Sequence, residues 1–225
     1  MDPRAQILEA HAVGRALTEG RVEQVRGHAL AQVRRSMGMT RKPLAPCQDP
    51  DLAYIAPDSV VRRVHGDLPA MLIGGLSALL FQMLHPLAMA GVAQHSNYRQ
   101  DPLGRLERTA SFLGTTTFGT VDQAREAIER VRRVHVRVQG MASDGRPYSA
   151  ADPDLLTWVH AAEVSSFLGA SRVYAAVAPT QQEADDYLAQ MAEVAIDLGA
   201  ADVPRSTAEL DVALSCLRDA MEETV

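Results

Sequence analysis

His135 is the residue whose surroundings in the sequence point most directly to chemistry. Apolar residues accompany it at the three- and four-residue steps of one helical face, namely Ala124, Ile128, Val131 and Val138. A buried imidazole must satisfy two ring nitrogens. One interpretation is a core histidine bonded to a backbone carbonyl, which spacing alone favours. The other is a metal or haem ligand, because neutral imidazole is a common protein ligand of such centres.

A second group of polar residues lies on the helix that Asp101-Pro102 is expected to begin. Arg105, Arg108 and Thr109 share one face, beside an apolar stripe. Cationic and hydroxyl groups next to apolar packing suit the anionic edge of a flat ligand, such as a haem propionate, or bound oxygen. A solvated arginine pair is the alternative interpretation.

A third group follows Asp152-Pro153. His160 and Glu163 share a stripe one helical turn apart and could pair. His160 is therefore a second candidate ligand, or a group that supports one. Together with His135, this pair also allows a non-haem iron site as an alternative. His85, beside Pro86, is expected in a turn or a pocket wall.

The elements that must position these residues are predicted to be helices. Capping residues, first-turn prolines and apolar periodicity predict helices over 4–36, 68–84, 86–93, 101–113, 120–139, 152–176, 180–199 and from 206 onward. No alternating strand and no internal repeat is found. Residues 37–58 contain four prolines and are predicted to be a linker. We therefore expect an N-terminal helical arm with its linker over 1–56, and an all-α domain over 57–225.

Composition and charge limit the classes of function that the protein can have. Hydrophobic residues make up 47% of the chain and aromatic residues 4%, which favours helix packing around a sizeable core. The net charge of −6 argues against nucleic-acid binding, and the arginines at 125–137 are expected on a solvated face. Two cysteines make thiolate metal sites improbable. No apolar leader is visible, so a cytoplasmic location is expected. Residues 68–93 carry no charge and are long enough to span a bilayer. Gly74-Gly75, Gln82, His85 and Pro86 interrupt this stretch, which favours a core helix over a membrane segment.

Short motifs in a fixed order carry a family resemblance. They are Pro57-Asp-Ser-Val60, Leu84-His-Pro86, Gly91-Val92, His95-Ser96, Asp101-Pro-Leu-Gly-Arg-Leu-Glu-Arg-Thr109, Val134-His135, Val138-Gln-Gly140, Gly145-Arg-Pro-Tyr148, Asp152-Pro and Trp158-Val-His160. In this order they resemble the domain family of the latex-clearing rubber oxygenases and the fungal MpaB-type oxygenases. The motifs cover about half the chain, and their order makes the resemblance specific.

The resemblance implies a globin-like helical core that holds haem b. In the rubber oxygenases a histidine downstream of an Arg-x-x-Lys-Thr motif is the proximal ligand, which points to His135. The motif itself falls on Arg105, Arg108 and Thr109. Arg108 stands where the rubber enzymes have lysine, and a protonated arginine has no lone pair to offer iron. Residues 68–100 also contain no Asp or Glu to match the distal glutamate of those enzymes.

These observations predict a haem b-dependent oxygenase that acts with dioxygen on a small apolar molecule. Arg105, Arg108 and Thr109 are the expected catalytic residues. The expected cofactor-binding residues are His135, as metal ligand, with Arg105, Thr109, His160 and His85. Alternatives are a non-catalytic haem-binding or sensing protein and a metal-free helical interaction domain. A homo-oligomer is compatible with the sequence, and the domain is expected to be shorter at its C-terminus than its relatives.

Overall fold

The computed structural model describes residues 44–222, with Gln24, 27–28 and 31–32 of the preceding segment; side chains are described as far as Ser215. The chain divides into two compact units, residues 1–42 and 43–225. The helix predicted over 4–36 lies mostly outside the described residues, and the described residues within it are helical. The second unit holds all of the predicted site residues.

Helices dominate this unit, which confirms the all-α prediction. They are α2 (Val60–Gly66), α3 (Leu68–Gln82), α4 (Pro86–His95), α5 (Pro102–Phe118), α6 (Val121–His135), α7 (Pro153–Tyr174), α8 (Gln181–Leu198) and α9 (Thr207–Glu222). A short antiparallel hairpin, β1 (Gln139–Met141) and β2 (Pro147–Ser149), separates α6 from α7.

Local capping explains where these helices begin. The side chains of Asp67, Asp101 and Asp152 accept hydrogen bonds from backbone N–H groups in the first turns of α3, α5 and α7, and each of these turns contains a proline. The capping boxes predicted at Thr120 and Thr180 are both present. The helix boundaries therefore follow from hydrogen-bonding groups that the sequence shows.

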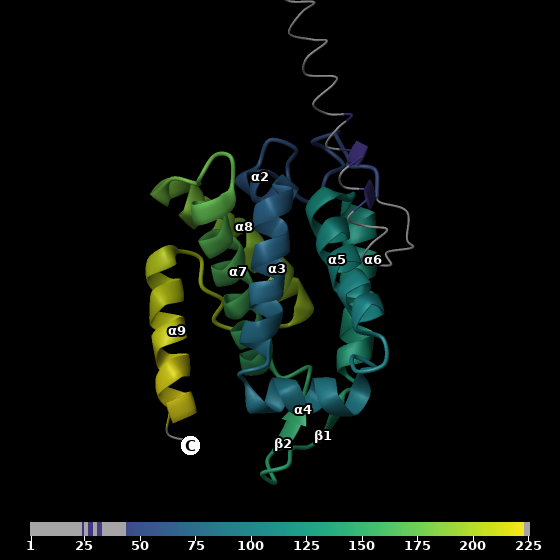
Figure 1. Cartoon of the computed structure of the whole chain (residues 1–225), viewed down its shortest axis with the longest axis vertical. Helices are drawn as coiled ribbons and strands as arrows, with labels where there is room; N and C mark the ends of the chain where they lie inside the picture. The colour runs from purple at the N-terminus through teal and green to yellow at the C-terminus, as the bar shows by residue number, and fades with distance from the viewer. Residues whose placement is uncertain (1–23, 25–26, 29–30, 33–43, 223–225) are drawn as a thin grey trace, which may run out of the picture. The chain divides into compact units, whose positions relative to one another are not determined.

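The helices pack in two pairs (Figure 1). α3 lies antiparallel against α7, and α5 with α6 forms a helical hairpin beside them. α4 runs across one end of both pairs, next to the β-hairpin, whereas α2 lies at the opposite end. α8 contacts both α6 and α7. We refer to the two ends of the bundle as the α2 end and the α4 end.

The hydrophobic core lies toward the α2 end. It includes the fully buried side chains of Val61, Val164, Phe167, Tyr187 and Leu188, from α2, α7 and α8. α3 lies close to α7 at Gly74, where a Cβ would be 2.7 Å from Phe167 Cδ1. These contacts fix α3 and α7 against each other.

The segment before α2 is part of the compact unit. The Cys47 N–H donates to the Phe118 carbonyl at 2.8 Å, and the buried Arg62 guanidinium donates to the carbonyls of Cys47 and Thr117. The boundary expected after residue 56 therefore lies inside this unit, which begins at Pro43. Proline content predicts an irregular segment here, but the backbone hydrogen bonds to the end of α5 tie it to the domain.

Three sequence expectations are corrected. The β-hairpin was not expected, because strands of three residues carry no alternation; its turn contains Gly145 with φ of 84°. Residues 115–118, expected to be a connector, belong to α5, where the Thr115 and Thr116 hydroxyls donate to carbonyls four residues back. α6 ends at His135 rather than near Gly140, because Gln139 and Gly140 pair with β2.

No single described helix is long and apolar enough to span a membrane. α2 and α3 pass such a test only when taken together, and they meet at an angle of 87°.

Candidate functional site

The α4 end of the bundle brings the predicted site residues together. α5 and α6 run antiparallel around Gly119-Thr120, with Arg105 14 residues before Gly119 and His135 15 residues after Thr120. Because each residue of a helix rises about 1.5 Å, Arg105 and His135 lie at the same level of the helical hairpin. Gln82 at the end of α3 accepts a hydrogen bond from Arg105, and His85 lies at the start of α4.

The inward faces of α5 and α6 change from buried to accessible toward this end. On α6, Ala124 and Ile128 are 0% and 3% exposed, whereas Val131 and His135 further along the same stripe are half-buried. A tightly packed helix would keep the whole stripe buried. The inward stripe is therefore accessible to solvent toward the α4 end.

α5 shows the same change in burial. Leu113 and Thr116 are buried, whereas Leu106 is half-buried and Thr109 is exposed on the same helical stripe. Thr109 thus belongs to the inward face at the α4 end. Its hydroxyl donates to the Arg105 carbonyl at 3.2 Å, which leaves the oxygen lone pairs free to accept.

His135 is the last residue of α6 and has a half-buried ring. Its Nδ1 is buried and has no hydrogen-bond partner among the described residues. Burial lowers the pKa of His135 below its ordinary value of 6.5, so the imidazole is neutral at pH 7. A neutral, unpartnered imidazole is the state that can bind a metal ion. The sequence predicts a buried ring within a helix that continues to Gln139, whereas α6 ends at His135 and the ring is half-buried.

α7 contributes two further titratable groups. His160 is 7% exposed, and its Nε2 has no partner among the described residues. Burial lowers the pKa of His160 to about 4 and raises that of Glu163 to about 7. The two side chains share a stripe, as expected, but the described residues show no hydrogen bond between them. Buried polar groups normally find partners, so the unpartnered Nε2 of His160 is an exception within this stripe.

The alternative of a non-haem iron site finds no support in this geometry. Within residues 44–215, no three His, Cys, Asp or Glu side chains converge as a metal ion would require. His135, His160 and Glu163 therefore do not form a three-ligand set.

Arg105 and Arg108 differ in their surroundings. The half-buried Arg105 donates from Nη2 to the Gln82 Oε1 of α3 at 3.1 Å. Burial, and to a lesser extent the charge of Arg108, lowers the pKa of Arg105. Arg108 is exposed and pairs with Asp101 at 3.5 Å. Of the two arginines, Arg105 alone thus bridges two helices at the α4 end.

His85 caps α4, since its Nδ1 accepts a hydrogen bond from the Ala88 N–H at 3.3 Å. Its ring lies 4.9 Å from the ring of Trp158 on α7, and burial lowers its pKa. This position agrees with the turn that the sequence suggests.

Several of the family-like motifs contact one another beneath the site. The Tyr148 hydroxyl of β2 donates to Gln94 Oε1 at 2.8 Å and lies 3.1 Å from His95 Nε2. A Cβ on Gly140 would lie 2.8 Å from the Tyr148 hydroxyl oxygen, so a larger residue there would displace the Tyr148 side chain. These motifs hold α4 against the β-hairpin.

His65 was not expected to have a role, yet it lies at the centre of a buried polar group. Its Nδ1 is 2.7 Å from Thr117 Oγ1 and its Nε2 is 3.0 Å from the Tyr187 hydroxyl. Burial lowers its pKa to about 4. No local sequence signal indicates this group, because its members come from three separate helices.

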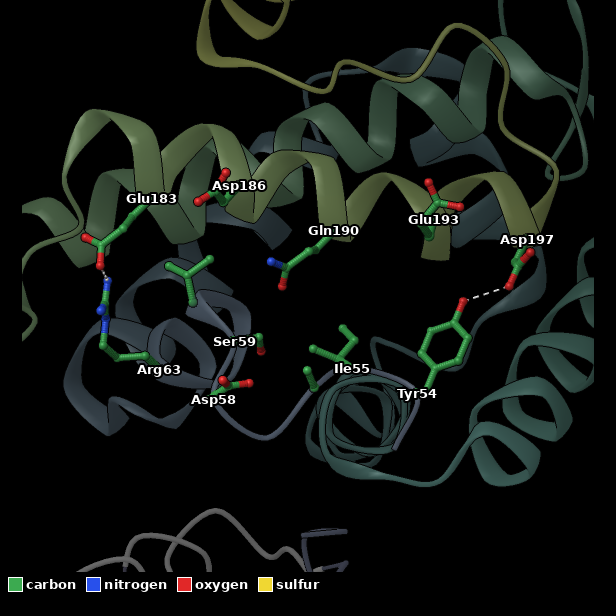
Figure 2. Close-up of a pocket in the computed structure, with 12 residues that line it drawn as sticks. Tyr54, Ile55, Asp58, Ser59, Arg63, Glu183, Asp186, Gln190, Glu193 and Asp197 are labelled. Atoms are coloured by element: carbon green, nitrogen blue, oxygen red, sulfur yellow. Dashed lines mark hydrogen bonds and ion pairs between the residues drawn. The ribbon is translucent and has the colours of Figure 1, made fainter. Parts of the chain in front are cut away.

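A second concave region lies on the outer face of α8 (Figure 2). This groove has a volume of about 810 Å³ and lies between α8 and residues 54–63. Its acidic lining comprises Asp58, Glu183, Asp186, Glu193 and Asp197. Arg63 pairs with Glu183 at 2.7 Å, and the Tyr54 hydroxyl donates to Asp197 at 2.7 Å. An acidic groove does not suit the apolar or anionic ligand expected at the α4 end.

The structure is a helical bundle whose predicted site residues on α5 and α6 lie toward the α4 end. Residues 62–222 match the family described as "ER-bound oxygenase mpaB/B'/Rubber oxygenase, catalytic domain". The chain therefore belongs to this family, as the motifs indicate, and its function is of the oxygenase type in general terms. No curated protein and no solved structure matches the chain.

Proposed function

We propose that this protein is a haem b-dependent oxygenase that acts on a small apolar molecule, with His135 as the iron ligand. The observation that carries the proposal is the unpartnered, neutral imidazole of His135 at the accessible end of an otherwise buried stripe. Family membership supports the reaction class. The burial pattern of α5 and α6 supports a cofactor site at the α4 end, because Leu106, Ala110 and Val131 are apolar and half-buried there.

Each residue then has a defined task. His135 offers a ring nitrogen to the iron, and His160 and His85 lie on the neighbouring helices. Arg105 offers a positive charge to an anionic group of the cofactor, such as a propionate. Thr109 offers hydroxyl lone pairs on the inward face, and Arg108 adds positive charge nearby. When bound, haem supplies the activation of dioxygen, which no amino-acid side chain provides.

The absorption spectrum of the purified, haem-supplemented protein tests the proposal. We expect a Soret band in the wild type, and its loss or a clear shift in His135→Ala. His95→Gln is the control, because His95 lies at the same end but bonds to Tyr148. A colourless wild type would refute haem binding, and an unchanged spectrum in His135→Ala would refute the ligand assignment.

Oxygen consumption separates an enzyme from a haem-binding or sensing protein. Haem-loaded protein with a reductant and candidate apolar substrates should consume oxygen in step with substrate loss. Haem binding without any substrate-dependent consumption would instead favour the non-catalytic alternative.

A further inference from the structure

The charge of Arg105 has no compensating carboxylate in the part of the chain that the structure describes. Its guanidinium is half-buried, and its hydrogen bond goes to the neutral side-chain amide of Gln82. Among the described residues no Asp or Glu pairs with it, whereas six other arginines do pair with acids, namely Arg63, Arg108, Arg130, Arg132, Arg146 and Arg205. The charged guanidinium of Arg105 is therefore half-buried with no anionic side chain beside it among the described residues.

Partial burial favours the binding of an anion beside this guanidinium. Removing a cation from water costs free energy that a nearby opposite charge or several hydrogen bonds must offset. Arg108, one turn away, adds repulsion, and burial lowers the pKa of Arg105. Arg105 has donors left over after its bond to Gln82, since a guanidinium has five.

Arg62 shows what a structural arginine looks like in the same protein. It is 7% exposed, donates to the carbonyls of Thr117 and Cys47, and lies 5.8 Å from the Phe118 ring centre. Three groups of the protein thus hold its cation, while its buried Nη2 has no partner among the described residues. Arg105 has one such group among the described residues, which indicates that its other partners come from a ligand.

The surroundings of Arg105 define the rest of that ligand. Leu106 follows Arg105 on α5, and Ala110 on α5 and Val131 on α6 are further half-buried apolar residues of these two helices. We propose that Arg105 binds the carboxylate of an amphipathic ligand whose apolar body lies along the accessible inward faces of α5 and α6. A planar guanidinium and a carboxylate match in two parallel hydrogen bonds.

Two sources can supply this carboxylate, a propionate of bound haem or a free carboxylic acid that serves as substrate. The inference rests on the proposed function only for the first source. The second source stands on Arg105 and its apolar neighbours alone. Both sources share the same contact, so one experiment with two arms tests them.

In the first arm, calorimetry measures the binding of decanoate and of decanol to the full chain, with and without haem. Wild type should bind decanoate about ten- to hundredfold more tightly, the ratio expected for hydrogen bonds to a charged group. Arg105→Gln should reduce decanoate affinity to that of decanol, whereas Arg105→Lys should keep part of the preference. Gln82→Ala should retain it, because only the neutral partner is removed. Arg130→Gln, on the outer face of α6, is the matched control.

In the second arm, haem titration compares wild type with Arg105→Gln. If a propionate is the partner, Arg105→Gln weakens haem binding, and haem loading abolishes the preference for decanoate. If a free acid is the partner, haem affinity is unchanged and the preference persists in the loaded protein. Far-UV circular dichroism verifies that each variant is folded.

The results separate this inference from the proposed function. Equal affinities for decanoate and decanol, with haem binding unaffected by Arg105→Gln, overturn the inference even if His135 binds haem. A preference for decanoate that depends on Arg105 supports it even if the protein binds no haem.

Discussion

The close approach of α3 to α7 at Gly74 gives a quantitative test of the packing. A Cβ at Gly74 would lie 2.7 Å from Phe167 Cδ1, 3.0 Å from Phe167 Cα and 3.2 Å from the Ser166 carbonyl oxygen. Two of these atoms belong to the α7 backbone and cannot rotate away. The Phe167 ring is 1% exposed and has no free space to enter. Gly74→Ala therefore forces the two helices apart.

Two opposing effects set the size of the change. Alanine is favoured over glycine in a helix by about 1 kcal/mol. Overpacking of a well-packed contact costs about 1–3 kcal/mol. We expect Gly74→Ala to lower the free energy of unfolding by up to about 2 kcal/mol. Gly169 on α7 is the matched control, because a Cβ there meets nothing within 4 Å. Gly169→Ala should be more stable than wild type by about 0.5–1 kcal/mol.

Urea unfolding measures both variants. Far-UV circular dichroism follows the helices, and the fluorescence of Trp158, the only tryptophan in the chain, follows the α3–α7 contact. The free energies of unfolding of the two variants should differ by about 1–3 kcal/mol, the overpacking cost. A Gly74→Ala protein as stable as Gly169→Ala would show that the helices are not in the close contact described, and the reasoning would fail.

Two further predictions concern Glu163 and Tyr148. Burial raises the pKa of Glu163 from 4.5 to about 7, so the folded protein keeps this proton at pH values where the unfolded chain has lost it. The free energy of unfolding therefore falls as the pH rises from 4.5 to 7. Glu163→Gln should therefore gain stability over wild type across this range, by up to about 3 kcal/mol, in urea unfolding at several pH values; His65 and His160 titrate in both proteins and cancel in the difference. A constant difference across the range, like that expected for the exposed Glu129→Gln, would contradict the burial of Glu163. Tyr148→Phe removes the hydroxyl that joins the hairpin to Gln94 and His95 and should lower the local stability of the hairpin by about 1 kcal/mol. The β1–β2 amides should then exchange hydrogen faster than they do in the control variant Tyr98→Phe. Equal exchange rates in the two variants would show that this hydroxyl does not hold the hairpin.

Helices could be predicted from the sequence because their signals are local. The aspartates at 67, 101 and 152, the capping boxes at 120 and 180, and Gly199 with φ of 109° act within one helical turn. α2 escapes prediction because its seven residues follow a proline-containing stretch that has the composition of a linker. The β-hairpin escapes prediction because its pairing is settled by contacts with α4, which no local pattern contains.

The candidate site was predictable only in part. Spacing puts His135 on an inward stripe and groups Arg105 with Arg108 and Thr109. Spacing cannot show that the stripe on α6 opens before it reaches His135, since burial depends on which helices pack against it. Nor can it find Gln82 as the partner of Arg105, because the two residues come from different helices and are 23 positions apart. The different surroundings of Arg105 and Arg108 likewise follow from tertiary contacts.

Burial changes along α5 and α6, so one end of each helix stabilises the fold and the other end is accessible to solvent. Side chains such as Ala124, Ile128 and Leu113 lie in full contact with their neighbours, so a change of volume there lowers stability. Leu106, Ala110 and Val131 already touch solvent, so their size can vary with little effect on folding. Descendants of this protein can therefore alter what they bind by substitutions at one end, while the other end keeps the fold above its stability threshold.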